Sequence, residues 1–180
     1  VEKPVAGEYR LINAGIYAFD PTIFEIIEQT PRDAGELALT DALIGRIKAE
    51  VPIEGVPVEG IWADATYPWD LLTLSQEVLR EGRVSEGERH LSVYVSQTAR
   101  IHDTATLQGP VVVGPDCEIC PGTVIGPDVA LGQNVTVGAN STIVESVLDV
   151  DTRIGPGSTL IETVTGQDVN LGAGTTVSMS

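Results

Sequence analysis

The stretch VGPDCEICPGTVIGPDVALGQNVTVGANSTIV, residues 113–144, decides the fold of the carboxyl-terminal half of this chain. An aliphatic residue returns at every sixth position from upstream of this stretch: Val95, Ile101, Leu107, Val113, Ile119, Ile125, Leu131, Val137 and Ile143. The fourth residue after each of these is small or β-branched: Ala99, Ala105, Val111, Cys117, Thr123, Val129, Val135, Ser141 and Val147. The step shortens to about five residues at Leu148 and again near Thr165. Such a fixed period indicates a repeat architecture.

The repeat predicts a prism of short strands. Three residues of each hexad can form a strand with two side chains inward and one outward. The other three residues make a corner, where Gly, Pro, Asn and Asp are frequent, as in Gly114-Pro115-Asp116. Three strands and three corners close a coil of about eighteen residues, which looks like the left-handed parallel β-helix, an exception to the right-handed crossover rule. A β-sandwich is the alternative, but its strands rarely keep a fixed period.

The charge balance excludes some classes of function. The chain has 180 residues and a net charge of −16, and its only lysines are Lys3 and Lys48. No basic patch is available, so nucleic acid is not an expected partner. A lysine-poor acidic surface suggests adaptation to high salt, where screening weakens self-repulsion. An ordinary acidic protein is the alternative.

Other features bear on location and on metal binding. No run of eighteen apolar residues and no signal peptide is visible, and the chain begins with Val1, so we expect a fragment of a cytoplasmic protein. Cys117 and Cys120 form a lone C-x-x-C without the further ligands that a zinc site needs. In the hexad register Cys117 points inward, so structural packing is the predicted role.

The amino-terminal part mixes helix and strand signals. We predict a buried strand over residues 10–19, short strands over 51–53 and 56–62, and three helices. The helices are expected to start at Asp20-Pro21, at Thr40 and at Pro68, and the last one should end at Glu81. The predicted organisation is therefore a partial α/β domain over residues 1–84, a linker over 85–93 and a β-helix over 94–180.

Four motifs in this part occur in a familiar order. They are Val1-Glu2-Lys3-Pro4, Asn13-Ala14-Gly15-Ile16-Tyr17, Thr40-Asp41-Ala42-Leu43 and Trp62-Ala63-Asp64. Followed by hexads, they resemble the second half of sugar-1-phosphate nucleotidylyltransferases. The subgroup that they resemble is the glucose-1-phosphate thymidylyltransferase-like type with a carboxyl-terminal left-handed β-helix.

The resemblance implies roles for five residues. The family joins a nucleoside triphosphate, here dTTP or UTP, to a sugar 1-phosphate such as glucose 1-phosphate and releases pyrophosphate. It implies that Glu2 hydrogen-bonds sugar hydroxyls, that Lys3 neutralises the sugar phosphate, and that Asn13 and Gly15 line the sugar pocket. It also implies that Asp64 binds Mg²⁺ together with an Asp from the first half. These residue types suit a reaction that depends on positioning and charge neutralisation.

The sequence departs from the family pattern in two respects. Where the family has D-x-G-T, this chain has Asp64-Ala65-Thr66-Tyr67. The Gly-rich nucleotide loop and the first metal Asp of the family are not found in it. We therefore expect these 180 residues alone not to catalyse nucleotidyl transfer. Purely structural roles are the alternative for these candidates: Lys3 could form a surface ion pair, and Asp64 could cap a turn.

Two other functions compete. Left-handed β-helices also serve acetyl- and acyltransferases, which need a His as general base. Only His90 and His102 exist, and neither falls near residues 154–159, where bifunctional relatives carry the base. A third possibility is a purely structural module, in which outward residues such as Val112, Val124 and Thr136 pack copies of the chain into a trimer.

Overall fold

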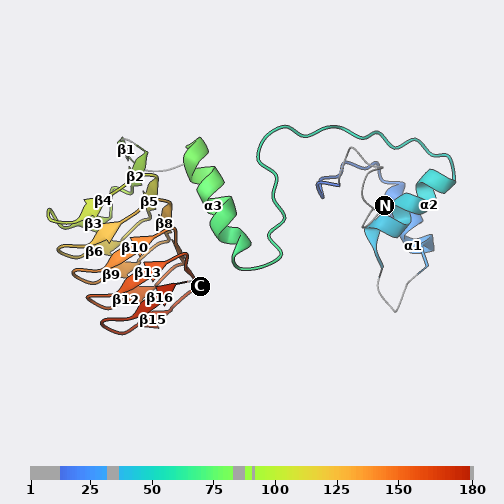
Figure 1. Cartoon of the computed structure of the whole chain (residues 1–180). Helices are drawn as coiled ribbons and strands as arrows, with labels where there is room; N and C mark the ends of the chain where they lie inside the picture. The colour runs from blue at the N-terminus through green and yellow to red at the C-terminus, as the bar shows by residue number, and fades with distance from the viewer. Residues whose placement is uncertain (1–12, 32–36, 83–87, 91, 179–180) are drawn as a thin grey trace. The chain divides into compact units, whose positions relative to one another are not determined.

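The computed structural model describes residues 13–31, 37–82, 88–90 and 92–178. The chain divides into two compact units, residues 1–62 and residues 63–180. Figure 1 gives the element labels used below. Glu2 and Lys3 lie outside the described residues. No helix in the described part is long and apolar enough to span a membrane.

The first unit contains two contacting helices, α1 (Ile23–Gln29) and α2 (Leu39–Lys48). The apolar face of each helix gives a small core, in which Ile23 and Ala42 are buried. Asp20 precedes α1 and accepts a hydrogen bond from the backbone N–H of Thr22 at 2.9 Å. Arg46 of α2 donates to the same carboxylate at 3.4 Å. The bonds from Thr22, and more weakly the one from Arg46, hold the pKa of Asp20 below its usual value.

The strands predicted in this unit are not found among its described residues. Residues 13–19 and 51–62 run without strand pairing, and most of their apolar side chains are exposed, for example Ile16 at 71% and Val56 at 74%. The physical reason is that a strand needs a neighbouring strand to satisfy its backbone groups, whatever its own residue preference. The described part of residues 1–62 offers none.

The second unit holds α3 and the strands. Helix α3 spans Asp70–Glu81, close to the predicted helix. The strands are short and regularly spaced: β1 (Glu88–His90), β2 (Val93–Val95), β3 (Arg100–Ile101), β4 (Thr106–Leu107), β5 (Val111–Val113), β6 (Glu118–Ile119), β7 (Val124–Ile125), β8 (Val129–Leu131), β9 (Thr136–Val137), β10 (Thr142–Val144), β11 (Val147–Leu148), β12 (Arg153–Ile154), β13 (Thr159–Ile161), β14 (Val164–Thr165), β15 (Asn170–Leu171) and β16 (Thr176–Ser178).

These strands form three sheets, and each coil contributes one strand to each sheet. The orders are β1-β2-β5-β8-β11-β14, β16-β13-β10-β7-β4 and β15-β12-β9-β6-β3. All pairs are parallel except β1 with β2, which is antiparallel. Figure 1 shows the coils stacked one on the next from β3 to β15. The predicted β-helix is confirmed.

The register follows the repeat, including its irregularities. In the first coils the paired residues are 18 positions apart, as in Val111↔Val129. From the fourth coil they are 17 apart, as in Leu131↔Leu148 and Val147↔Val164. The five-residue steps at Leu148 and Thr165 therefore each shorten one coil by one residue, at the corner between the sheet of β10 and the sheet of β11.

The core is the predicted aliphatic column with its small neighbours. The fully buried apolar residues include Ile119, Ile125, Val137, Ile143 and Leu160, each 1% exposed or less. One predicted inward position is wrong, because Ser146 is buried and Val147 is half-buried. The short step before Leu148 moves the inward position back by one residue. The buried Ser146 hydroxyl is satisfied, since it donates to the Val144 carbonyl at 2.6 Å.

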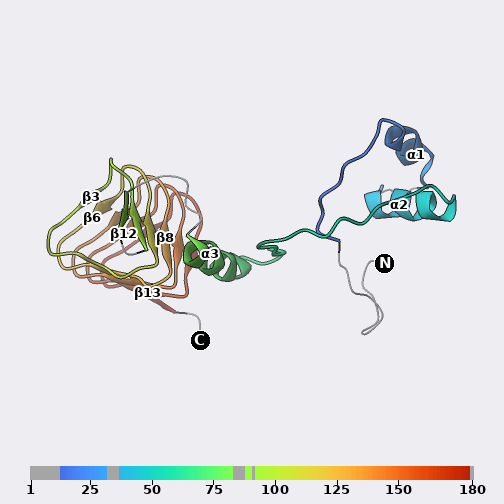
Figure 2. The same ribbon diagram turned by 90° about the horizontal axis from the view of Figure 1, so that it is seen from above.

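Helix α3 packs against the β-helix, on the sheet that contains β8 and β11. Leu72 and Leu79 are its buried residues, and Figure 2 shows the helix beside β8. The Tyr94 hydroxyl of β2 donates to the Gly82 carbonyl at 3.3 Å, just after the helix ends. The compact unit with the β-helix thus begins at Ala63, whereas the domain boundary after residue 84 stays a prediction from the sequence.

Candidate functional site

The Asn13-Ala14-Gly15 segment forms a tight turn. The backbone N–H of Gly15 donates to Asn13 Oδ1 at 2.9 Å, and Gly15 has a φ of +75°, which favours glycine. The Asn13 amide group donates to the Tyr17 hydroxyl. Both Asn13 and Gly15 are exposed. The expectation that Asn13 sits inside an apolar strand is therefore wrong, and its amide is held by local bonds at the surface.

This turn lies against the fourth motif, at its first residue. The Trp62 indole N–H donates to the Ala14 carbonyl oxygen at 3.1 Å, across 48 positions of sequence. A single hydrogen bond thus brings the residue that opens Trp62-Ala63-Asp64 to the turn between Asn13 and Gly15. Both motifs were predicted to belong to one site, and the structure brings these parts of them together.

Asp64 is exposed and lies two residues after Trp62 along the chain. The loop that follows is closed by Asp70, whose Oδ2 accepts from the backbone N–H groups of Thr66 at 2.9 Å and Tyr67 at 2.7 Å. The Tyr67 and Trp69 rings stack above this turn, with centroids 4.6 Å apart. The glycine missing from the family pattern is therefore not needed for an ordered loop. Sequence reasoning overlooked Asp70, although a carboxylate in the first turn of a helix signals such a cap.

The described side chains do not assemble a metal centre around Asp64. In the described ranges no three His, Cys, Asp or Glu residues gather as a metal ion would require. The described residues thus offer Mg²⁺ the single carboxylate of Asp64 and do not form a metal site by themselves.

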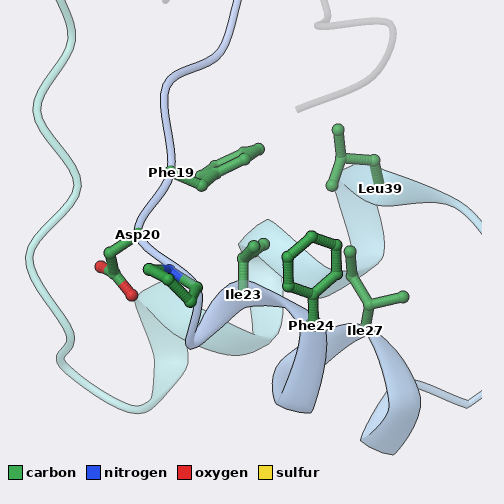
Figure 3. Close-up of a pocket in the computed structure, with 7 residues that line it drawn as sticks. Phe19, Asp20, Ile23, Phe24, Ile27 and Leu39 are labelled. Atoms are coloured by element: carbon green, nitrogen blue, oxygen red, sulfur yellow. The ribbon is translucent and has the colours of Figure 1, made fainter.

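The first unit has a cavity of about 410 Å³ beside α1. It is lined by Phe19, Asp20, Pro21, Ile23, Phe24, Ile27 and Leu39, which Figure 3 draws as sticks. Among the described lining residues the only charged group is Asp20, whose carboxylate is engaged by Thr22 and Arg46. None of Asn13, Gly15 or Asp64 lines it. The described lining of the cavity does not provide the convergent polar groups of a sugar site.

The groups that other chemistries would use have structural partners. His102 lies exposed at a corner of the first coil, with Nδ1 2.9 Å from the Thr104 hydroxyl. Cys117 is buried, its thiol donates to the Gly132 carbonyl at 3.0 Å, and burial raises its pKa. Neither Cys117 nor Cys120 forms a disulfide. The structural role predicted for Cys117 is confirmed.

Residues 90–178 match the family model described as the GMPPB C-terminal domain. The bifunctional protein GlmU of Methanococcus aeolicus is 35% identical over 121 residues, which cover 67% of this chain and 26% of that protein. A bifunctional sugar-1-phosphate nucleotidylyltransferase/acetyltransferase of Sulfurisphaera tokodaii is 30% identical, over 68% of this chain and 28% of its own. The low-salt glycan biosynthesis nucleotidyltransferase Agl11 of Haloferax volcanii is 38% identical, over 45% of this chain and 23% of its own.

A solved structure of a perosamine N-acetyltransferase from Caulobacter crescentus is 17% identical to this chain with a TM-score of 0.32, and the match covers 61% of this chain and 58% of that one. The chain spans roughly a quarter of the length of the relatives named above. Their names and the matched domain confirm the resemblance to the carboxyl-terminal part of sugar-1-phosphate nucleotidyltransferases.

Proposed function

We propose, from the kinship of this chain with sugar-1-phosphate nucleotidyltransferases, that it serves an enzyme joining dTTP or UTP to a sugar 1-phosphate such as glucose 1-phosphate, with release of pyrophosphate. The observation that carries the proposal is the Trp62–Ala14 hydrogen bond, which brings together two motifs of the family. A glucose-1-phosphate thymidylyltransferase-like specificity, a cytoplasmic location and a salt-adapted acidic surface belong to the same proposal. Two free cysteines support the location.

In the proposed reaction an oxygen of the sugar phosphate attacks the α-phosphorus of the triphosphate, and pyrophosphate leaves. Such a transfer depends on holding the reactants in line and neutralising their charge. Lys3 is assigned to the sugar phosphate as a point charge. Glu2 is assigned to the sugar hydroxyls, and the turn of Asn13 and Gly15 to the sugar ring. Gly15 would let the ring approach the backbone closely.

Asp64 is assigned as one ligand of Mg²⁺, which supplies positive charge to the phosphates when it is bound. The described residues do not complete such a site, so no step is derived through the metal. We also propose that the activity needs the nucleotide-binding part of the enzyme, with its Gly-rich loop, and that these 180 residues do not turn over alone.

The test uses the two lysines of the chain as variant and control. Pyrophosphate release from dTTP or UTP with glucose 1-phosphate is measured for the intact enzyme and for the 180-residue chain. Lys3→Met in the intact enzyme should lower kcat/KM by about 100-fold or more, the range seen when one electrostatic contact to the transition state is lost. Lys48→Met, at the exposed end of α2, should leave the rate unchanged. An unaffected Lys3→Met enzyme, or turnover by the 180-residue chain, would refute the proposal.

Acetyl transfer is the second candidate, favoured by the name of the Sulfurisphaera tokodaii relative and by the stretch Asn170–Thr175, which matches bifunctional relatives. Against it, residues 103–178 contain no histidine to act as general base. Calorimetry with acetyl-CoA on the intact protein separates the two, since a nucleotidyltransferase alone should show no binding heat.

A further inference from the structure

The Asp70 side chain binds the loop that precedes α3 and not the helix to which it belongs. Its Oδ2 accepts hydrogen bonds from the backbone N–H groups of Thr66 at 2.9 Å and Tyr67 at 2.7 Å. A capping carboxylate would accept from N–H groups of the first helical turn, and α3 has no side-chain bond at its amino-terminal cap. The two bonds therefore hold the loop and leave the free donors of the helix unsatisfied.

The position of Asp64 depends on the backbone of this loop. Asp64 is exposed, and within the part of the chain that the structure describes its carboxylate makes no hydrogen bond or ion pair. Thr66, which Asp70 binds, follows two residues later. Residues 64–70 are all described and none has a positive φ, so the loop has a shape that does not need the glycine of the family pattern. The fixed points of the loop then decide where the Asp64 carboxylate lies.

The helix that carries Asp70 is firmly mounted. Its Leu72 and Leu79 are buried where it packs beside β8 and β11 (Figure 2). Just past its last turn, the Gly82 carbonyl accepts from the Tyr94 hydroxyl at 3.3 Å. Groups on a packed helix are held more precisely than groups on a loop. Asp70 therefore transfers the order of the helix to the loop.

The stacked rings of Tyr67 and Trp69 are the competing way to order the loop. Their centroids are 4.6 Å apart, and both side chains are about half exposed. This contact lies on the helix side of the loop. The Thr66 N–H is the bonded group closest along the chain to Asp64, and its partner is Asp70. The carboxylate is thus better placed than the rings to control Asp64.

We infer that Asp70 is a positioning residue, which holds the Asp64 loop in the arrangement that the transfer reaction uses. The inference rests on the proposed function through the role assigned to Asp64, and it routes no step through a metal ion. Hydrogen bonds to a charged acceptor are stronger than bonds to a neutral one. A displacement of about 1 Å in a positioned group can lower a rate by about 100-fold. Loss of the Asp70 bonds should therefore reach the reaction through Asp64.

The structural part of the test is hydrogen exchange in the intact enzyme, read by mass spectrometry on a peptide that covers residues 64–70. Asp70→Ala should speed exchange at Thr66 and Tyr67 about 10-fold or more, because their N–H groups lose a charged acceptor. Asp70→Asn keeps an acceptor oxygen at the same place and should preserve most of the protection. Unchanged exchange in Asp70→Ala would overturn the inference.

The kinetic part is pyrophosphate release by the same enzymes. Asp70→Ala should lower kcat about 10- to 100-fold and leave KM for the sugar 1-phosphate unchanged, because the sugar-binding turn is not touched. Asp70→Asn should retain most of kcat. Glu77→Ala is the matched control, an exposed carboxylate about two turns further along α3, and should change neither constant. A merely structural role of Asp70 would not divide kcat from KM in this way.

Asp70→Glu keeps the inference testable if Asp70→Ala does not fold. It preserves the charge and favours the helix, but it moves the carboxylate by one CH₂ group, so kcat should fall about 10-fold. Wild-type kcat in every folded Asp70 variant, in an enzyme that Lys3→Met disables, would overturn the inference and leave the proposed function standing. An intact enzyme without turnover would instead refute the proposed function, and this inference with it.

Discussion

Arg80 of α3 donates a hydrogen bond to Asp128 Oδ2 at 2.8 Å, at the corner that precedes β8. Asp128 is 6% exposed, whereas the Arg80 side chain is 61% exposed. The pairing with Asp128 raises the pKa of Arg80. The other carboxylate oxygen of Asp128 is buried and has no hydrogen-bond partner in the described part of the chain. Arg80 is therefore the group that makes a buried carboxylate tolerable at this corner.

Replacement of Arg80 should expose this dependence. Arg80→Leu leaves the Asp128 carboxylate buried without its cation, so we expect thermal unfolding to occur about 2–4 °C lower at pH 7. Arg100→Leu breaks the exposed pair with Glu118 and should change the melting temperature less. Equal shifts for the two variants would contradict the prediction.

The apolar contact of α3 should matter more than its ion pair. Leu79 is 4% exposed, so Leu79→Ala should destabilise the second unit by about 2–5 kcal/mol. Leu71 of the same helix is 40% exposed, and Leu71→Ala should cost less than about 1 kcal/mol. Urea unfolding followed by circular dichroism measures both. A negligible effect of Leu79→Ala would mean that α3 does not pack on the β-helix in solution.

Two glycines at equivalent corners of stacked coils should differ in how much stability is lost when each is replaced by alanine. A Cβ atom at Gly138 would lie 2.5 Å from the Pro156 nitrogen, whereas one at Gly172 would meet nothing within 4 Å. Gly138→Ala must therefore push two coils apart and should cost about 1–3 kcal/mol. Gly172→Ala should be neutral or slightly stabilising. Chemical denaturation of the two single variants measures the change in unfolding free energy for each. A larger loss for Gly172→Ala than for Gly138→Ala would show that the corner spacing is wrong.

The thiol of Cys117 predicts both a reactivity and a pH dependence. A thiol reagent should modify Cys120 in the native chain and Cys117 only after unfolding, because Cys117 is fully buried. Its raised pKa means that the stabilising contribution is complete below the pKa of the unfolded thiol, about 8.5. That contribution is lost as the pH rises through the higher pKa of the folded thiol. Cys117→Ala should remove this part of the alkaline loss, as measured by unfolding between pH 7 and about pH 10.

The Trp62–Ala14 bond predicts an effect on substrate binding in the intact enzyme. Trp62→Phe keeps an aromatic ring but removes the indole N–H, so the Asn13–Gly15 turn loses an anchor. We expect KM for the sugar 1-phosphate to rise several-fold with a smaller change in kcat, since the turn is assigned to binding. Trp69→Phe, in the stacked pair with Tyr67, is the aromatic control and should leave KM unchanged. A fall in kcat alone would place Trp62 in another role.

The β-helix could be predicted from the sequence because each hexad contains its own inward-facing residue. The period of these residues alone therefore fixes the register between neighbouring coils. The error at Val147 arose where the period changed, and only the pairing Leu131↔Leu148 shows which residue turns inward. The docking of α3 could not be predicted. An amphipathic pattern tells which side of a helix is buried but not which surface covers it.

The candidate site was harder to predict for a related reason. The residues around Ile16 and Val56 favour a β-strand only where another strand is available for pairing. The described part of the first unit contains no such neighbouring strand. The turn at Gly15 was suggested by its residue type, whereas the bond from Trp62 spans a separation that no local pattern encodes. Glu2 and Lys3 rest on the resemblance alone, since they lie outside the described residues.

The unequal coils also bear on fibre growth. Paired residues are 18 positions apart at the first coils and 17 apart at the last, so the two ends of the prism have different perimeters. A copy stacked end to end would have to match a longer ring to a shorter one, and its backbone groups would fall out of step at one corner. In addition, β1 runs antiparallel along β2 and occupies that edge of the first coil. A solenoid whose coils change in perimeter, and whose first coil has one of its three edges covered, resists uncontrolled end-to-end polymerisation.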